Sequence, residues 1–393
     1  MFGVATSARA AAAMRDATRM AATTTATLLG QLDRGEVRLR PGDVVIADEF
    51  GMQGTRDGSR RITATQAVGA RLVIIGDPKQ LPEIEAGGLL GALMKRLPVV
   101  TLDVNRRQHN LEERLALDEL RAGKTDAAVR RYERNGNLTL ADDPAELCDQ
   151  LVTDWFHAGE DVDAAHRRHP SETGLMVAAT RHGTHDLNAR ARELLFEHGL
   201  LGRPLAAIGS LEFAVGDRVV ALQNRYDLGV LNGDFGTVVG ADTTSVRIRL
   251  DSGPTRVVPA SYVVDGHLDH GYATTVHKGQ GATCERLFLL GDEAVYAELG
   301  YTALSRGREH NHVYALRADL DDAGDENADP LDRLARRLSA SHAQTAAVDL
   351  DPRDPTNTDE SPRVPRKAAL LATGSASRSL QSDQYRQPLD QSL

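Results

Sequence analysis

Short runs of aliphatic residues that end in acidic side chains dominate the first hundred positions of the chain. Residues 44–47 run directly into Asp48 and Glu49, and residues 72–75 are followed two positions later by Asp77. Because neither run alternates with polar residues, each predicts a strand buried on both faces, as in a parallel sheet covered by helices. Ligands of such sheets lie beyond the carboxyl ends of the strands. The pattern therefore predicts that these acids meet at one edge of a sheet.

Strand and helix patterns continue along the chain. Residues 99–104 predict another strand, and residues 111–134 predict two charged helices that close a first domain. A helix predicted over residues 143–159 places Trp155 on its apolar face, where packing in the core is favoured over stacking on a base. A later strand leads into a helix whose expected N-cap is Thr184.

The period of the pattern changes to two between residues 213 and 264, and turn residues become frequent. This predicts a small antiparallel barrel. Its polar side chains are either contacts for a guided strand or solvated turn residues: Arg218, Asn224, Arg225 and Asn232. Residues 349–393 cannot bury enough apolar area to fold alone, which predicts a tail or a partner-binding segment.

The acids suggest phosphate chemistry. An acid after a buried strand can hold Mg²⁺ through its water shell, and a second acid can orient or deprotonate the attacking water. Gln80, close behind the second run, can sense a terminal phosphate. Each acid alone also fits a helix cap or a turn. Two such runs at this spacing favour the phosphate interpretation.

The two acid runs resemble motifs II and III of superfamily 1 helicases. From about residue 3 to residue 316 the chain is similar to the helicase half of conjugative relaxase-helicases and to the exonuclease V alpha-subunit group, with the motifs in the family's order. The resemblance implies an α/β fold with two RecA-like parallel-sheet P-loop NTPase motor domains, the first of them incomplete. The expected domains are residues 1–135 and 136–318, with an SH3-like β-barrel insert at about 211–264 and an acidic tail at 319–393.

The same resemblance implies ATP and Mg²⁺ as cofactors, single-stranded DNA as partner, and 5′ to 3′ movement. Asp48 would hold Mg²⁺, Glu49 would orient the water and Gln80 would sense the γ-phosphate. The charge of that phosphate would be stabilised by two arginines, Arg107 and Arg306. Further nucleotide contacts are implied for Asp77, Lys79, Gly279, Gln280 and Arg308. Contacts to the DNA backbone are implied for Ser7, Arg9, Thr275, His277 and Lys278.

Three of these residues also have simpler interpretations. Ser7 fits the N-cap of an ordinary helix, and Arg107 fits a basic surface turn. His277 has no partner ligands at metal-binding spacing, which disfavours a metal site there.

The family's phosphate-binding loop is missing from the sequence. No stretch of the form GxxxxGK[ST] occurs, although the backbone amides and the lysine of that loop normally hold the phosphates. We therefore expect a truncated copy, a misassigned start or half of a split gene, with another chain supplying the loop. The relaxase domain of the family is also absent, so no nicking is expected. The alternative is an ATPase-deficient module that binds DNA or a partner.

Composition sets wider limits. A chain of 393 residues with 41% hydrophobic residues is typical of a globular protein of two or three domains. The net charge of −10 argues against a uniformly basic surface. No apolar run approaches the roughly 20 residues that span a bilayer, which predicts a cytoplasmic protein. The two cysteines, Cys148 and Cys284, lack metal or disulfide spacing and are expected to be buried or inert.

Overall fold

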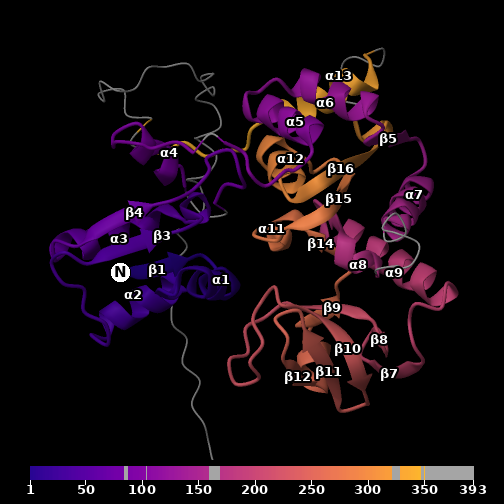
Figure 1. Ribbon diagram of the computed structural model, residues 1–393, viewed down its shortest axis with the longest axis horizontal. Helices are drawn as coiled ribbons and strands as arrows, with labels where there is room; N and C mark the ends of the chain where they lie inside the picture. The colour runs from indigo at the N-terminus through magenta and orange to yellow at the C-terminus, as the bar shows by residue number, and fades with distance from the viewer. Residues whose placement is uncertain (84–86, 103, 159–168, 321–327, 347–348, 350–393) are drawn as a thin grey trace, which may run out of the picture. The chain divides into compact units, whose positions relative to one another are not determined.

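The structure is a computed structural model that describes residues 1–83, 87–102, 104–158, 169–320, 328–346 and 349 (Figure 1). Contacts divide the chain into Met1–Leu350 and Asp351–Leu393, and only the first unit contains described residues. From residue 350 on, the expected tail therefore lies outside the described residues.

The first sheet is parallel and has the strand order β2-β1-β3-β4. Its strands are β1 (Phe2–Ala5), β2 (Ala21–Thr24), β3 (Val44–Ala47) and β4 (Arg71–Ile74). The predicted pairing of the two acid-terminated strands is confirmed, because β3 and β4 are parallel neighbours. The expectation that both are buried on both faces was wrong for β4. That strand lies at the edge of the sheet, where Val73 and the following Ile75 are 44% and 47% exposed.

Helices connect these strands and cover the sheet. They are α1 (Ala8–Thr18), α2 (Thr25–Asp33), the 3-10 turn η1 (Phe50–Met52), α3 (Thr55–Ala67) and α4 (Leu89–Met94). Ser7 is the N-cap of α1, because its side chain accepts a hydrogen bond from the amide of Ala10 at 3.1 Å. A small core between sheet and helices contains Val4, Leu28, Leu39 and Val45.

The strand expected at residues 99–104 does not form in the described part of that stretch. Val100 and Leu102 are 89% and 86% exposed. An extended segment becomes a strand only when a neighbouring strand satisfies its backbone groups. Among the described residues, no strand pairs with the outer edge of β4.

Helices α5 (Leu111–Arg121) and α6 (Thr125–Arg134) differ from the expected domain assignment. Instead of closing the first domain, they pack with α12 (Ala297–Leu304), α13 (Pro330–Ser339) and β16 (Gly307–Leu316). Leu117 of α5 and Val129 of α6 share a core cluster with Leu287 and Leu304 of the second sheet region. The apolar faces of these helices therefore pack into the core of the second sheet. A charge pattern alone does not indicate this packing.

The second sheet is also parallel, with the order β14-β6-β15-β16-β5. Its strands are β5 (Leu138–Ala141), β6 (Gly174–Ala178), β14 (Ala273–Thr275), β15 (Cys284–Gly291) and β16 (Gly307–Leu316). Its helices are α7 (Pro144–His157), α8 (Pro170–Thr173), α9 (Arg181–Glu197), α11 (Val276–Gly279), α12 (Ala297–Leu304), η2 (Ala318–Leu320) and α13 (Pro330–Ser339).

Two helix predictions have clear outcomes. Core packing of Trp155 is confirmed, because the ring is fully buried and its Nε1 donates to the carbonyl of Gly174 at 3.1 Å. The expected N-cap at Thr184 was wrong. The N-cap of helix α9 lies four residues earlier, where the side chain of Thr180 accepts from the amide of Gly183 at 3.2 Å.

An antiparallel β unit separates β6 and α9 from β14. It consists of a five-stranded sheet in the order β12-β11-β10-β9-β13 and a hairpin of β7 and β8. The alternating burial along β11 confirms the period-two pattern predicted there. We call this unit the insert; its elements are β7 (Pro204–Ile208), β8 (Leu211–Ala214), β9 (Arg218–Ala221), β10 (Phe235–Ala241), β11 (Ser245–Leu250), β12 (Thr255–Pro259), α10 (Ala260–Val264) and β13 (Leu268–His270).

The polar candidates of the insert are engaged within it. Arg218 forms an ion pair with Asp251, and Arg225 forms one with Asp227 at 2.6 Å. The side chain of Asn224 accepts a hydrogen bond from the amide of Asn232 at 2.8 Å.

Candidate functional site

The carboxyl ends of β3 and β4 carry the acids, as their parallel pairing requires. We call this place the acid edge and define it by Asp48, Glu49 and Asp77. The amide of Asp48 donates to the carbonyl of Val4 at 2.8 Å, which fixes the chain against β1. Oδ1 of Asp48 accepts from the amide of Glu49 at 2.9 Å. The first carboxylate is therefore oriented by its own backbone.

Glu49 has an uncommon backbone conformation, with φ 50° and ψ 41°. This left-handed region is disfavoured for residues other than glycine, and such strain often occurs at functional sites. Burial raises the pKa of the Glu49 carboxyl, and the neighbouring Asp48 raises it further. Arg306, Gln280 and Arg107 oppose that rise. Gln280, which follows α11, donates to Oε2 of Glu49 at 3.4 Å.

A glutamine and an arginine join the acid edge to the second sheet. A guanidinium nitrogen of Arg306 donates to Oε1 of Gln80 at 3.0 Å, and its Nε donates to the carbonyl of Thr302 at 2.9 Å. Arg306 is only 2% exposed. Burial lowers its pKa to about 10, with the charge of Arg107 as the next cause. The side chain remains a cation at neutral pH.

Arg107 and Gln108 lie beside this pair. Arg107 donates to the carbonyl of Ser305 at 3.1 Å. Gln108 is 3% exposed and donates to the carbonyls of Ser305 and Gly307, at 3.0 and 2.8 Å. Gln108 thus holds the backbone on both sides of Arg306. Sequence reasoning missed Gln108, and only its position next to Arg107 was a signal.

A cavity of about 230 Å³ adjoins these residues, and Gln80, Arg107, Gln108 and Tyr301 are among those lining it. Asp77 accepts from the hydroxyl of Tyr301 at 3.3 Å, and Arg121 lies 3.5 Å from the same carboxylate. The roles of Tyr301 and Arg121 were not expected from the sequence. They come from α12 and α5, which the fold alone brings to this edge.

Two of the residues expected to contact the nucleotide have exposed side chains. Lys79 is exposed, and its amide donates to Oδ1 of Asp77 at 3.0 Å. The side chain of Arg308 is also exposed, and its carbonyl accepts from the amide of His109 at 2.8 Å. Gly279 is buried at the end of α11, immediately before Gln280.

The expected DNA contacts form two groups. Thr275 caps α11 at the carboxyl end of β14, and Lys278 lies in that helix with His277. Burial lowers the pKa of Lys278, and the positive charge of Arg181 contributes. Arg181 opens α9, so two strand ends of the second sheet bring cations near one another.

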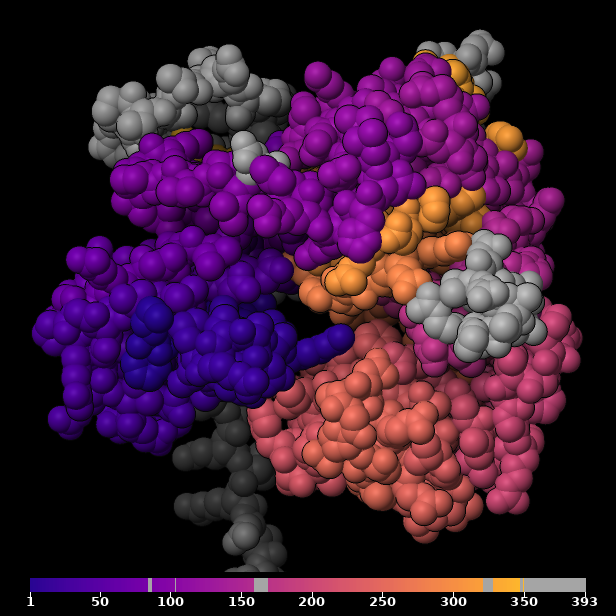
Figure 2. All heavy atoms as spheres, in the orientation of Figure 1, coloured from indigo at the N-terminus to yellow at the C-terminus, as the bar shows by residue number. Residues whose placement is uncertain are grey.

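Arg9 forms the other group with Ser7. Its guanidinium donates to the carbonyl of Gly233 in the insert at 2.6 Å and lies 5.5 Å from the ring centroid of Phe235. Figure 2 shows the indigo N-terminal segment reaching the salmon-coloured insert. Burial lowers the pKa of Arg9. Arg9 therefore contacts the insert directly, whereas Ser7 remains an exposed helix cap.

The donor set of the acid edge fits a magnesium nucleotide only in part. Among the described residues, no three His, Cys, Asp or Glu side chains are grouped to hold a metal by themselves. Mg²⁺ usually takes one or two carboxylates and completes its shell with water and phosphate oxygens, which Asp48 can support. The buried arginines suit a terminal phosphate. The chain contributes no glycine-rich loop for the other phosphates.

Comparisons with known proteins agree with this geometry. Residues 1–143 match the family model AAA_30, described as an AAA domain. The conjugal transfer protein TraA of Rhizobium radiobacter is 33% identical over 72% of this chain and 25% of its own length. The RecBCD enzyme subunit RecD of Mycolicibacterium smegmatis is 27% identical over 82% of this chain and 60% of its own length.

A solved structure shows the same fold. The Pif1 helicase from Bacteroides, crystallised with ADP-AlF3 and ssDNA, has a TM-score of 0.50 and 16% identity, and the match covers 84% of this chain and 83% of that one. The two parallel sheets, linked by the contact between Gln80 and Arg306, thus define an α/β protein with a RecA-like fold, as in that Pif1 helicase.

Within that class, the chain is a homologue of the TraA conjugal transfer proteins and of the RecD helicases. It spans only 25% of the length of the TraA relative from Rhizobium radiobacter. Within the described part of the chain, no helix combines the length and apolarity needed to cross a bilayer.

Proposed function

We propose that this chain is the motor part of an ATP-dependent DNA helicase that moves 5′ to 3′ along single-stranded DNA, as in conjugative DNA transfer in the cytoplasm. One observation carries the proposal: Gln80 of the first sheet region and Arg306 of the second meet beside Glu49. A nucleotide bound there would contact both sheets, so its binding and release would draw them together and let them separate.

The residues have distinct proposed roles. Asp48 would hold Mg²⁺ through its water shell, and Glu49 would orient and deprotonate the attacking water. Gln80 would sense the γ-phosphate, while Arg107 and Arg306 would bind its oxygens. The metal, when bound, neutralises charge on the phosphates. Gln108 and Thr302 would keep Arg306 in place through the contacts described above.

The remaining expected contacts are proposed with the same assignment. Asp77, Lys79, Gly279, Gln280 and Arg308 would lie around the nucleotide. Ser7, Arg9, Thr275, His277 and Lys278 would contact the DNA backbone, where cationic side chains contribute most of the affinity. The Bacteroides Pif1 helicase that shares this fold was crystallised with ssDNA, which supports this ligand class.

We further propose that another chain or segment supplies a phosphate-binding loop that raises the ATP turnover of this chain above the level it reaches alone. A strand added beside the outer edge of β4 would end next to Asp77 and could present such a loop to the acid edge. Val73 and Ile75 expose apolar surface at that edge, which an added strand would cover. A relaxase domain is a second proposed partner.

The second candidate function is a module that binds DNA or a partner without turning over ATP. The outer edge of β4, which pairs with no strand in the described part of the chain, favours it, because a site completed by another chain is inactive until that chain arrives.

Unwinding of tailed duplexes tests the proposal. The substrates are DNA duplexes with either a 5′ or a 3′ single-stranded tail, incubated with ATP and Mg²⁺, and Glu49→Gln is the inactive control. We expect strand separation of the 5′-tailed duplex only, and none with Glu49→Gln. Unwinding that persists in Glu49→Gln contradicts the role of the acid edge. DNA binding without unwinding supports the second candidate.

A further inference from the structure

The chain that follows α13 reaches from the second sheet region to the first. Helix α13 ends at Ser339, and residues 340–346 continue without forming a helix or a strand. We call residues 340–346, together with Asp349, the strap. In Figure 1 the orange chain after α13 runs towards α4. The strap therefore has contacts with both sheet regions.

The second-sheet end of the strap is anchored on α12. Glu298 of that helix is 4% exposed, and its Oε2 accepts from the amide of His342 at 3.0 Å. Its other carboxylate oxygen accepts from the hydroxyl of Ser341. The ring of His342 stacks on that of Tyr296, with the ring centroids 4.2 Å apart. Because a buried carboxylate that loses its donors costs free energy, this end of the strap is held firmly.

Gln344 attaches the strap to the first sheet region. Its Nε2 donates to the carbonyl of Glu83 at 3.0 Å, and its Oε1 accepts from the amide of Gly87 at 2.9 Å. One side chain thus satisfies both a donor and an acceptor of the backbone that follows β4.

Gly88 leaves room for the strap. Its φ is 79°, and a Cβ on it would lie 2.3 Å from the amide nitrogen of Ala346 and 2.7 Å from the carbonyl carbon of Thr345. Both are backbone atoms, which cannot rotate away as the end of a flexible side chain can. Any side chain at this position would therefore displace the strap.

Asp349 fixes the far end of the strap beside α4. Its side chain is 7% exposed and forms ion pairs with Lys95 at 3.0 Å and with Arg96 at 2.6 Å. Both cations directly follow α4. The amide of Asp349 donates to the carbonyl of Ala346 at 2.9 Å, which ties this carboxylate to the rest of the strap. A buried carboxylate with two cationic partners is held more strongly than an exposed ion pair.

The strap and the contact between Gln80 and Arg306 join the same two stretches of chain. Thr302 of α12 accepts from the amide of Leu81 at 2.9 Å, so α12 meets the first region directly as well as through the strap. We propose that the strap holds α12 against residues 80–88 and thereby limits how far the acid edge can open. This proposal rests on the proposed function in taking that opening as the step that admits and releases the nucleotide.

The distance between the two sheet regions tests the strap without requiring turnover. Spin labels are attached to the full chain at Ser59→Cys in α3 and Glu133→Cys in α6, two exposed positions. Double electron–electron resonance then gives the distance between the labels in the absence of nucleotide. Burial raises the pKa of Cys148 and of Cys284 to about 12, so the native thiols react slowly with the labels.

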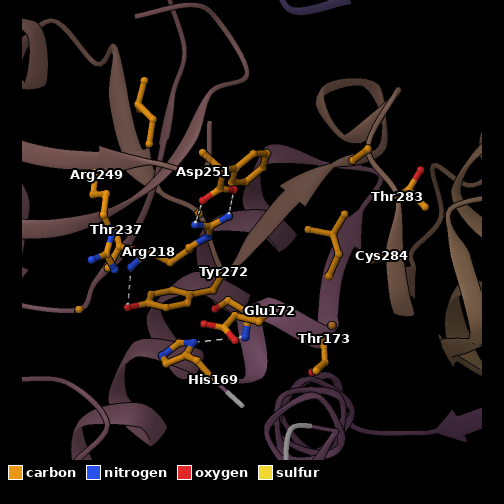
Figure 3. A pocket seen from close by; sticks show the side chains of 18 of the residues that line it. His169, Glu172, Thr173, Arg218, Thr237, Arg249, Asp251, Tyr272, Thr283 and Cys284 are labelled. Atoms are coloured by element: carbon orange, nitrogen blue, oxygen red, sulfur yellow. Dashed lines mark hydrogen bonds and ion pairs between the residues drawn. The ribbon is translucent and has the colours of Figure 1, made fainter. Parts of the chain in front are cut away.

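Two strap variants have matched controls. Gly88→Ala places a methyl group against the strap, whereas Gly42→Ala changes a glycine with φ 86° that has nothing within 4 Å of its Cβ position. Asp349→Asn breaks the ion pairs between the regions, whereas Asp251→Asn breaks the ion pair with Arg218 inside the insert. Figure 3 shows that pair beside a cavity of about 890 Å³, and no described residue that lines this cavity belongs to the strap.

Both strap variants should lengthen and broaden the distribution of distances, and both controls should leave it unchanged. In assays of ATP hydrolysis with single-stranded DNA, Asp349→Asn should raise the KM for ATP about tenfold at unchanged kcat, because the nucleotide must then close the regions unaided. A lower kcat at unchanged KM would overturn the strap, since that pattern indicates only a loss of folded protein. Thermal unfolding checks that the variants fold, and Asp349→Asn decides the matter if Gly88→Ala does not.

The outcomes separate the strap from the proposed function. Unchanged distances in the strap variants overturn the strap and leave the proposed function standing. Equal lengthening in the strap variants and in the controls also overturns it, because general destabilisation would then be the cause. If the wild type does not hydrolyse ATP, the proposed function fails, and longer distances in the strap variants alone still support the strap.

Discussion

Arg306 donates to the side-chain oxygen of Gln80 at 3.0 Å, although 226 positions separate the two residues in the chain. Gln80 follows the edge strand of the first sheet, and Arg306 directly precedes β16 of the second. Next to them, the amide of Leu81 donates to the hydroxyl of Thr302 at 2.9 Å. The contact thus couples the end of one sheet to the beginning of a strand in the other.

Replacing Arg306 tests this coupling. Arg306→Lys keeps the charge but loses the planar fork that binds two phosphate oxygens. We expect DNA-stimulated ATP hydrolysis to fall by roughly 10³-fold, the lower end of the range for arginines that reach a transferring phosphate. Arg317→Lys, an exposed arginine beyond the same strand, is the control and should hydrolyse ATP at the wild-type rate. Equal rates for the two variants would remove Arg306 from the site.

The raised pKa of Glu49 predicts that the Glu49→Gln variant is more stable than the wild type, by an amount that depends on pH. In the folded state the buried carboxyl resists ionisation, so its ionised form costs free energy once the pH exceeds the pKa of the unfolded state. Glu49→Gln removes that cost. We expect its Tm to exceed the wild-type Tm by about 1 to 3 °C at pH 8, and the difference to shrink as the pH falls below the usual pKa of glutamate. A gain that grows toward acidic pH would show that the carboxylate is stabilised by its neighbours.

Much of the fold follows from the sequence because the signals are local. The runs that lead to Asp48 and to Asp77 indicate parallel strands, and spacing alone places Trp155 in the core. The alternating pattern of the insert likewise requires no knowledge of distant residues.

The failures share a cause, which is tertiary contact. Residues 99–104 have the composition of a strand but meet no partner strand among the described residues. The charges of α5 and α6 do not reveal that Glu113 and Tyr132 face the second sheet. At the site, Gln108 and Tyr301 become relevant only because folding carries them to Arg306 and Asp77.

Glu113 should be essential for the packing of α5 against β16 of the second sheet. This buried carboxylate of α5 accepts from the amide and the side chain of Asn311 at 3.1 and 2.7 Å, and from the side chain of Asn137 at 3.1 Å. Glu113→Leu would leave these donors unpaired, and we expect it to lower the free energy of unfolding by about 3 kcal/mol in urea titrations.

Glu113→Gln is the matched variant, since it keeps one acceptor and nearly the same volume. It should cost less than half as much as Glu113→Leu. Similar losses for the two substitutions would mean that packing, and not hydrogen bonding, holds α5 against β16.

Lys278 is expected to contribute one phosphate contact. Lys278→Gln should make the salt dependence of single-stranded DNA binding less steep by about 0.7. Lys124→Gln, at an exposed lysine before α6, should leave it unchanged. If both variants behave like the wild type, the DNA does not pass over α11.

The most direct test of the account is ATP hydrolysis by the purified 393-residue chain, with and without single-stranded DNA, beside Glu49→Gln. The account predicts turnover that DNA stimulates and that Glu49→Gln abolishes. Turnover equal in the two proteins, or no turnover in either, would contradict a working nucleotide site at the acid edge of this chain.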